Sequence, residues 1–131
     1  MSHSMREWRR YVKSTELSMP QFATLMHLYH KGGCGISDIS SHLDVTTAAA
    51  SQQVDRLVQL KLLERAEDPH DRRAKQVTLS PKGRTLIEKG VEVRNQWIDQ
   101  LATKLTPEQR QNVITAVEQL TDAARKLDTE A

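Results

Sequence analysis

The spacing of apolar residues in this chain changes from helical to strand-like in one short segment and then returns to helical. Before this segment apolar residues recur every three to four positions, whereas Val77 and Leu79 alternate with polar neighbours. Ser80 and Pro81 then supply an N-cap and a first-turn proline for another helix. A segment this short has room for one hairpin. We expect its strands at Leu63–Glu67 and Ala74–Leu79 and its tip at 68–73. The chain is therefore predicted to be mainly α with a small β-hairpin.

Helical spacing recurs on both sides of the hairpin. We expect helices at about Met5–Val12, Met19–His30, Ile36–Leu43 and Thr46–Lys61, and from Pro81 and Pro107 onward. Ser18, Thr46 and Thr106 are candidate N-caps, and the glycine-rich turn 31–35 ends the second helix. Only two residues, 44 and 45, separate the third helix from the fourth, so these helices are predicted to form a helix-turn-helix.

Composition limits the size and the class of the protein. Of its 131 residues, 37% are hydrophobic and 27% are charged, which is enough for one modest core, so we expect a single domain. The one cysteine, Cys34, excludes an internal disulfide and fits a reducing compartment. No window approaches the ~18 apolar residues of a membrane span, and residues 1–13 carry arginines where a secretory signal would be apolar. We therefore expect a cytoplasmic protein without a membrane partner.

The common catalytic arrangements are absent from the sequence. It has no glycine-rich phosphate loop, no Ser/His/Asp arrangement with a turn to present a nucleophile, and no paired carboxylates in an apolar setting. We therefore expect neither an enzyme nor a cofactor. Residues 61–84 contain seven basic side chains against four acidic ones, whereas residues 92–131 contain five against seven. A basic middle and a mildly acidic tail predict a polyanion as the partner of the middle.

The helix Thr46–Lys61 has an apolar arc and a polar arc when its residues are placed on a helical wheel. Its polar arc carries small and hydrogen-bonding side chains rather than lysines and glutamates. A helix-turn-helix followed by a hairpin is the order of a winged helix, which inserts its second helix into the DNA major groove and reaches flanking DNA with the hairpin. The candidate DNA-binding residues are Thr47, Ala48, Ser51, Gln52 and Arg56 on the helix, and Asp71, Arg72, Arg73 and Lys75 at the hairpin.

Side-chain chemistry suggests individual roles. We expect Gln52 to read a base, since glutamine pairs bidentately with adenine. Arg73 suits a narrow minor groove, and Asp71 is placed to hold it extended. Arg56 either pairs near Asp55 or reaches phosphate, and the sequence does not separate these roles. Two other interpretations stay open: an ordinary amphipathic helix beside a solvated turn, and a winged-helix module that binds protein instead of DNA.

The two C-terminal helices carry apolar stripes that are long for a chain of this size. A second copy of the chain would supply the missing partner surface, so we expect a two-fold homodimer built from the first helix and the last two. Trp97, on the fifth helix, is expected in the core. Residues 1–18 are then an N-terminal helix contributing to dimerisation, residues 19–83 the winged helix-turn-helix, and residues 84–131 the C-terminal dimerisation helices.

Four short motifs follow one another between Val54 and Gly83, in the stretch VDRLVQLKLLERAEDPHDRRAKQVTLSPKG. They are DRL at 55–57, L-x-R at 63–65, D-x-R at 71–73 and L-[ST]-x-x-G at 79–83. As a set, they resemble the MarR (multiple antibiotic resistance regulator) family of winged-helix transcription factors. The resemblance extends from about Met19 to the end of the chain.

This resemblance implies a dimeric repressor or activator, with Arg73 in the minor groove, Asp71 supporting it, and the helix from Thr46 in the major groove. It also implies loss of DNA affinity when a small phenolic or aromatic ligand binds or when a cysteine is oxidised. The chain departs from the family pattern at Gln52, where many members carry a basic residue, and in a shorter segment before Met19.

Cys34 and two histidines have a spacing compatible with metal binding. His27, His30 and Cys34 stand at i, i+3 and i+7, but the helix end and the glycine turn leave the third ligand unplaced. We therefore expect no metal site, and partly buried or surface histidines instead. Cys34 has no second cysteine and no evident base beside it, which favours a structural role over redox sensing. His42 and His70 are isolated in the sequence and are expected to be solvated or near phosphate.

Overall fold

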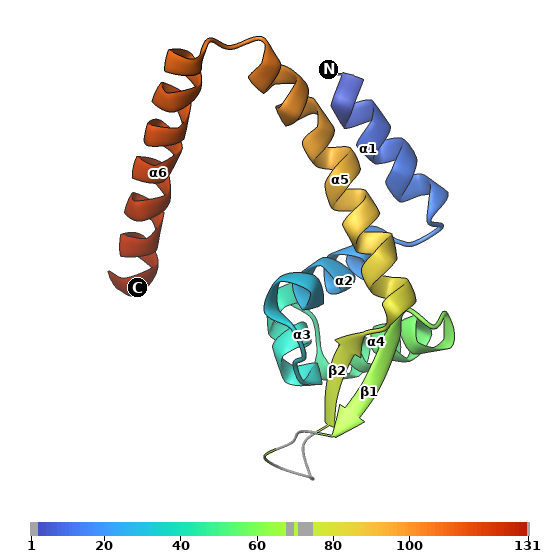
Figure 1. The fold of residues 1–131 in the computed structure, drawn as a ribbon. Helices are drawn as coiled ribbons and strands as arrows, with labels where there is room; N and C mark the ends of the chain where they lie inside the picture. Colours follow the sequence, from blue (N-terminus) through green and yellow to red (C-terminus); the bar gives the residue numbers. More distant parts are fainter. Residues whose placement is uncertain (1–2, 68–69, 71–74, 131) are drawn as a thin grey trace. The chain divides into compact units, whose positions relative to one another are not determined.

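The computed structural model describes residues 3–67, 70 and 75–130. Its elements are α1 (His3–Ser14), α2 (Met19–Lys31), α3 (Ile36–Leu43), α4 (Thr47–Gln59), β1 (Leu63–Glu67), β2 (Lys75–Leu79), α5 (Pro81–Thr103) and α6 (Pro107–Glu130). This order of helices around one antiparallel hairpin (Figure 1) confirms the predicted mainly α fold. No helix within the described ranges is both long and apolar enough to cross a membrane. The chain divides into two compact units, Met1–Arg94 and Asn95–Ala131.

Capping hydrogen bonds and residues with positive φ mark the ends of α2, α3 and α4. Ser18 caps α2 by accepting a hydrogen bond from the backbone N–H of Gln21, and the Gln21 side chain accepts one from the N–H of Ser18. Gly32 ends α2 at φ 87°, a conformation that glycine adopts easily. Asp44 turns the chain between α3 and α4 at φ 52°, and the Thr46 hydroxyl caps α4. The predicted helix-turn-helix is thus confirmed with its predicted cap.

The hairpin has a defined register and a third backbone segment beside it. β1 and β2 pair antiparallel, with Leu63 opposite Leu79. Ala74, which the sequence assigned to the second strand, lies outside the described residues. Cys34 pairs with Val77 through two backbone hydrogen bonds of 3.1 and 2.8 Å. This pairing, which the sequence did not predict, attaches the turn after α2 to β2.

The hydrophobic core lies in the first unit and joins α2, α3, α4, the hairpin and the first half of α5. Its largest side chains, each less than 2% exposed, are Leu25, Leu28, Ile39, Leu57, Leu63, Ile87, Val54, Val77 and Thr24. From α1, Val12 is buried and Trp8 meets Phe22 edge to face, with ring centroids 5.8 Å apart. This packing fixes α4 and the hairpin in one rigid frame.

The second unit leaves its apolar side chains exposed. The large ones are Trp97, Ile98, Leu101, Val113, Ile114, Val117, Leu120 and Leu127. Within its described residues α6 buries no side chain, although Thr106 and Gln109 form the predicted capping box at its start. The expectation that Trp97 lies in the core is wrong, since the side chain is 38% exposed. The buried cluster consists of residues from the first unit only, so Trp97 has no core within its own unit to join.

Candidate nucleic-acid interface

One side of α4 is anchored in the core and the other faces solvent, as its helical wheel predicts. Ala50, Val54 and Leu57 are completely buried. The exposed candidates are Thr47, Ala48, Gln52 and Arg56, with Ser51 partly exposed. Thr47, Ala48, Ser51 and Gln52 lie in the N-terminal half of α4, the part of a recognition helix that contacts base edges, whereas Arg56 lies in its last turn. The structure therefore brings the helical part of the predicted DNA-binding surface together on one accessible face.

An ion pair joins this helix to the hairpin. The Arg65 guanidinium in β1 contacts the Asp55 carboxylate in α4, and both side chains are about half exposed. Sequence reasoning placed Asp55 near Arg56 and missed Arg65, although the two partners lie in the adjoining motifs DRL and L-x-R. Arg56 is exposed and forms no ion pair with another described residue. Its guanidinium is accordingly accessible to a phosphate.

Part of the predicted wing is described and part is not. Lys75 begins β2, is exposed, and stands opposite Glu67 in the hairpin register. Asp71, Arg72 and Arg73 lie outside the described residues. The base of the wing is rigid, because Val77 is 1% exposed and carries the backbone pairing to the turn after α2.

The base of the hairpin is tied to α5 through Ser80. The Ser80 hydroxyl donates a hydrogen bond to the carbonyl of Lys61 at 2.6 Å and accepts one from the N–H of Gly83 at 3.0 Å. A side chain at position 83 would place its Cβ 2.1 Å from the carbonyl oxygen of Leu62. Only glycine permits this approach, which gives the motif L-[ST]-x-x-G a physical reason. The wing and the start of α5 therefore form one joint.

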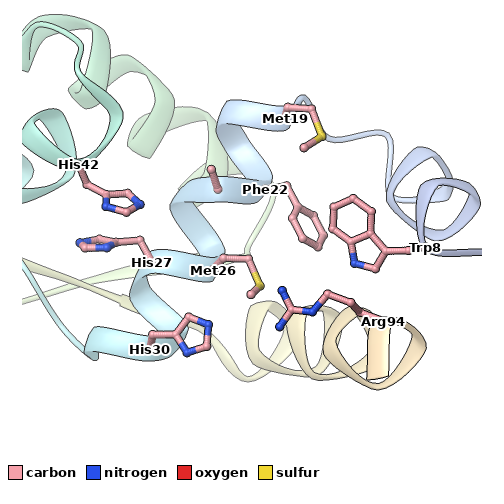
Figure 2. Close-up of a pocket in the computed structure, with 9 residues that line it drawn as sticks. Trp8, Met19, Phe22, Met26, His27, His30, His42 and Arg94 are labelled. Carbon is pink, nitrogen blue, oxygen red and sulfur yellow. The ribbon is translucent and has the colours of Figure 1, made fainter. Parts of the chain in front are cut away.

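A pocket of about 410 Å³ opens between α1, α2 and α5 (Figure 2). Its lining is mostly apolar and comprises Trp8, Met19, Phe22, Ala23, Met26, His27, His30, His42 and Arg94. In Figure 2 the rings of His27 and His42 lie face to face, and their centroids are 3.9 Å apart. His42 is therefore not isolated as the sequence suggested, although it is exposed. Arg94 gives the pocket a single permanent positive charge among its lining residues.

Next to this pocket, His27 meets two other titratable groups. One ligand atom each from His27, Cys34 and Asp38 lie within 4.8 Å of one another, whereas the exposed His30 is not part of this group. Burial, followed by neighbouring His42, lowers the pKa of His27, and burial raises the pKa of the Cys34 thiol. A hydrogen bond from Lys31 lowers the pKa of Asp38. Asp38 was not predicted from the sequence as a member of this group, because its only signal was its position four residues after Cys34.

Comparisons with known proteins agree on one family. The MarR family model matches residues 17–75. The HTH-type transcriptional regulator YwhA of Bacillus subtilis is 30% identical over 121 residues, which are 85% of this chain and 87% of YwhA. The transcriptional regulator Tm0710 of Thermotoga maritima superposes with a TM-score of 0.78 at 25% identity, over 96% of this chain and 89% of that one.

A more distant relative has been captured with ligands. MepR of S. aureus has a TM-score of 0.77 in its ethidium-bound structure, at 21% identity over 92% of this chain and 88% of that one. A MepR variant bound to an oligodeoxyribonucleotide has a TM-score of 0.66, also at 21% identity, over 92% and 89%. At this identity the likeness shows the fold alone. The family match and the similarity to YwhA show that this chain belongs to the MarR family of DNA-binding, winged helix-turn-helix transcriptional regulators, which are not enzymes.

Proposed function

We propose that this regulator is a homodimeric repressor that binds a pseudo-palindromic operator, with one α4 in the major groove of each half-site. The observation that carries the proposal is the exposed face of α4, where small and hydrogen-bonding side chains lie beside a rigid wing. Such a face can approach base edges closely, and hydrogen-bonding side chains such as Gln52 can pair with them. Two-fold symmetry sets the half-sites about one helical turn, roughly 10 base pairs, apart.

Each residue of this face has a proposed contact. Gln52 accepts from and donates to one adenine, which is a bidentate contact. Thr47 and Ser51 bind phosphate or a base edge, and Ala48 touches a thymine methyl group. Arg56 binds a phosphate, which its exposure and lack of an ion pair with any described residue allow. These contacts divide the face into base readers and a backbone anchor.

The wing supplies the second set of proposed contacts. Arg73 enters the minor groove beside each half-site, with Asp71 holding its guanidinium extended, and Arg72 lies next to the DNA backbone. Lys75 is exposed at the start of β2 and binds phosphate as a point charge. The ion pair between Arg65 and Asp55 keeps this wing in register with α4.

The proposed dimer uses the helices that bury little on their own. Residues 84–131 and the N-terminal segment 1–18 from each copy form the two-fold interface, while residues 19–83 contact DNA. The support is the apolar stripe on α6, which leaves Leu120 71% and Leu127 69% exposed. Stripes of this kind are typical of helices that pack in symmetric oligomers.

A small aromatic anion is the proposed effector, and the pocket beside Trp8 is its proposed site. Apolar walls with one arginine suit a planar ring bearing a carboxylate or phenolate. Binding there would lower DNA affinity if the ligand prefers a protomer arrangement that does not fit the operator. Benzoate added to a Trp97→Phe variant, in which Trp8 is the remaining tryptophan, should quench the emission. Emission unchanged at millimolar benzoate would remove this effector class.

Fluorescence anisotropy with DNA from immediately upstream of the gene tests the main proposal. Compared with a scrambled duplex across a salt series, the native duplex should bind at least about a hundredfold more tightly, with a steep salt dependence. Arg73→Ala should weaken binding and lower the salt slope by about one unit, because one counterion fewer is released. No binding to either duplex at low salt would favour a winged helix that binds protein instead.

A further inference from the structure

Three side chains from separate parts of the first unit meet at one point. His27 lies in α2, Cys34 in the turn that follows it, and Asp38 in the first turn of α3. An imidazole nitrogen, a sulfur and a carboxylate oxygen from these residues all lie within 4.8 Å of one another. The ligand atoms of a tetrahedral zinc ion, with bonds of about 2.0–2.3 Å, lie roughly 3.3–3.8 Å apart. A small contraction would therefore bring the three atoms to bonding distance of one ion.

The buried imidazole nitrogen of His27 is unsatisfied within the part of the chain that the structure describes. Its Nε2 atom is buried, and the side chain is only 14% exposed, yet Nε2 has no hydrogen-bond partner among the described residues. Asp38 Oδ1 lies 3.6 Å from Nε2, which is too long for a hydrogen bond and close to the spacing of two ligands on one metal. Buried polar atoms without a partner are rare, so a missing ligand is a physical explanation for this one.

Asp38 is oriented in the way a single-oxygen ligand requires. Its Oδ2 contacts the Lys31 ammonium, while Oδ1 faces His27. A carboxylate can keep the first contact and bind a metal through the second oxygen, and Lys31 then acts as the outer partner that fixes the ligand. The Asp38 side chain is 31% exposed, which leaves an entry path from solvent.

The other two ligands are held before any ion arrives. The two backbone hydrogen bonds to Val77 fix the position of Cys34, which is 4% exposed. The ring of His27 is stacked on His42 at 3.9 Å, which restricts its rotation. Ligands held by rigid elements lose little freedom on binding a metal.

We propose that His27 Nε2, Cys34 Sγ and Asp38 Oδ1 bind one divalent transition-metal ion of the zinc class, with a water molecule as the fourth ligand. Nitrogen and sulfur donors favour zinc or cobalt over calcium and magnesium, which prefer oxygen. The thiol proton passes to solvent when the metal–sulfur bond forms. The ion would join α2, α3 and the turn attached to the wing, and it requires nothing of the DNA-binding proposal.

Titration of the reduced, metal-free full chain with Co²⁺ tests the site. A thiolate-to-cobalt absorption band should appear together with the strong visible bands of tetrahedral cobalt, and both should saturate at one ion per chain. Zn²⁺ should displace the cobalt and remove the colour. Cys34→Ser should abolish the thiolate band, while His27→Gln and Asp38→Asn should each weaken binding at least about tenfold.

His30→Gln is the matched control, because His30 lies on the same helix outside the cluster, and it should bind cobalt as the unaltered chain does. Circular dichroism must show that each variant is folded, and Zn²⁺ should raise the melting temperature of the unaltered chain but not of Cys34→Ser. The proposal is overturned if no tetrahedral cobalt spectrum forms at millimolar Co²⁺. It is equally overturned if Cys34→Ser keeps the thiolate band, or if His30→Gln weakens binding as much as His27→Gln.

Discussion

The first unit, Met1–Arg94, and the second, Asn95–Ala131, are both helical but differ in what stabilises them. The first closes a core in which Leu25, Ile39 and Leu57 are completely buried. The second exposes half or more of nearly every large apolar side chain that it carries. The capping of their helices is equivalent, because Ser18 and Thr106 both form complete capping boxes. Local sequence therefore determines where a helix forms, whereas burial depends on a partner surface, which the second unit lacks within itself.

The largest expected effect is a loss of stability in the first unit, where the core is closed. Gly83→Ala would place a methyl group 2.1 Å from the Leu62 carbonyl oxygen, so the wing and α5 must separate. We expect the free energy of unfolding to fall by more than about 3 kcal/mol in urea denaturation. Gly35→Ala is the control, because its Cβ would meet nothing within 4 Å, and it should cost less than about 1 kcal/mol. Equal losses in both variants would contradict the close approach at Gly83.

The next effect should be confined to the second unit. Leu120→Glu buries an unpaired charge in the proposed dimer interface and should weaken association by about 3 kcal/mol, more than a hundredfold. Gln119→Glu introduces the same side chain at the neighbouring polar position of α6 and should leave association nearly unchanged. Sedimentation velocity across a concentration series measures both variants. If both dissociate equally, or neither does, the apolar stripe is not the interface.

A change on α4 should alter base preference in DNA binding without altering dimerisation. Gln52→Ala should cost about 1–3 kcal/mol at one base position and relax the preference there, while the dimer is unaffected. Gln59→Ala makes the same change at the far end of α4 and should alter operator affinity by less than about 0.5 kcal/mol. Anisotropy against a set of duplexes with single base substitutions distinguishes them. An unchanged base preference in Gln52→Ala would remove its role as a base reader.

The smallest effect concerns the link between α4 and the wing. Asp55→Asn removes the ion pair with Arg65, and because both side chains are about half exposed, the unfolding free energy should fall by less than about 1 kcal/mol. Glu88→Gln, which removes the exposed pair with Arg84, serves as the comparison. Operator affinity should fall in Asp55→Asn but not in Glu88→Gln, since only the former positions the wing. Equal affinity in both would show that the pair does not align the wing with α4.

Features that depend on neighbouring residues could be predicted from the sequence, whereas features that depend on tertiary contacts could not. The caps at Ser18, Thr46 and Ser80 depend on neighbouring residues, so the helix starts could be predicted with the hairpin between them. The exposed face of α4 also followed from helical periodicity alone. Contacts between distant segments could not be predicted in this way, because their partners are set by the tertiary fold. The pairing of Cys34 with Val77 is one example, and the ion pair between Asp55 and Arg65 is another.

Two expectations depended on contacts that only the tertiary fold creates. His42 is exposed, as expected of a solvated side chain, but it is not isolated, because packing α3 against α2 stacks it on His27. Trp97 was expected in the core because tryptophan is usually buried, yet its unit has no buried cluster. In both cases residue type was a poor guide, because the environment is created by elements that the local sequence does not reveal. The approach of Asp38 to His27 and Cys34 belongs to the same class.

Sedimentation velocity of the chain at micromolar concentration, alone and with a labelled duplex from upstream of its gene, tests whether a second copy completes the second unit and so pairs two DNA-reading first units. If it does, the chain should sediment as a particle of twice the mass of one chain, and the complex should contain two chains on each duplex. A monomer in solution that binds the duplex one chain at a time would contradict this pairing.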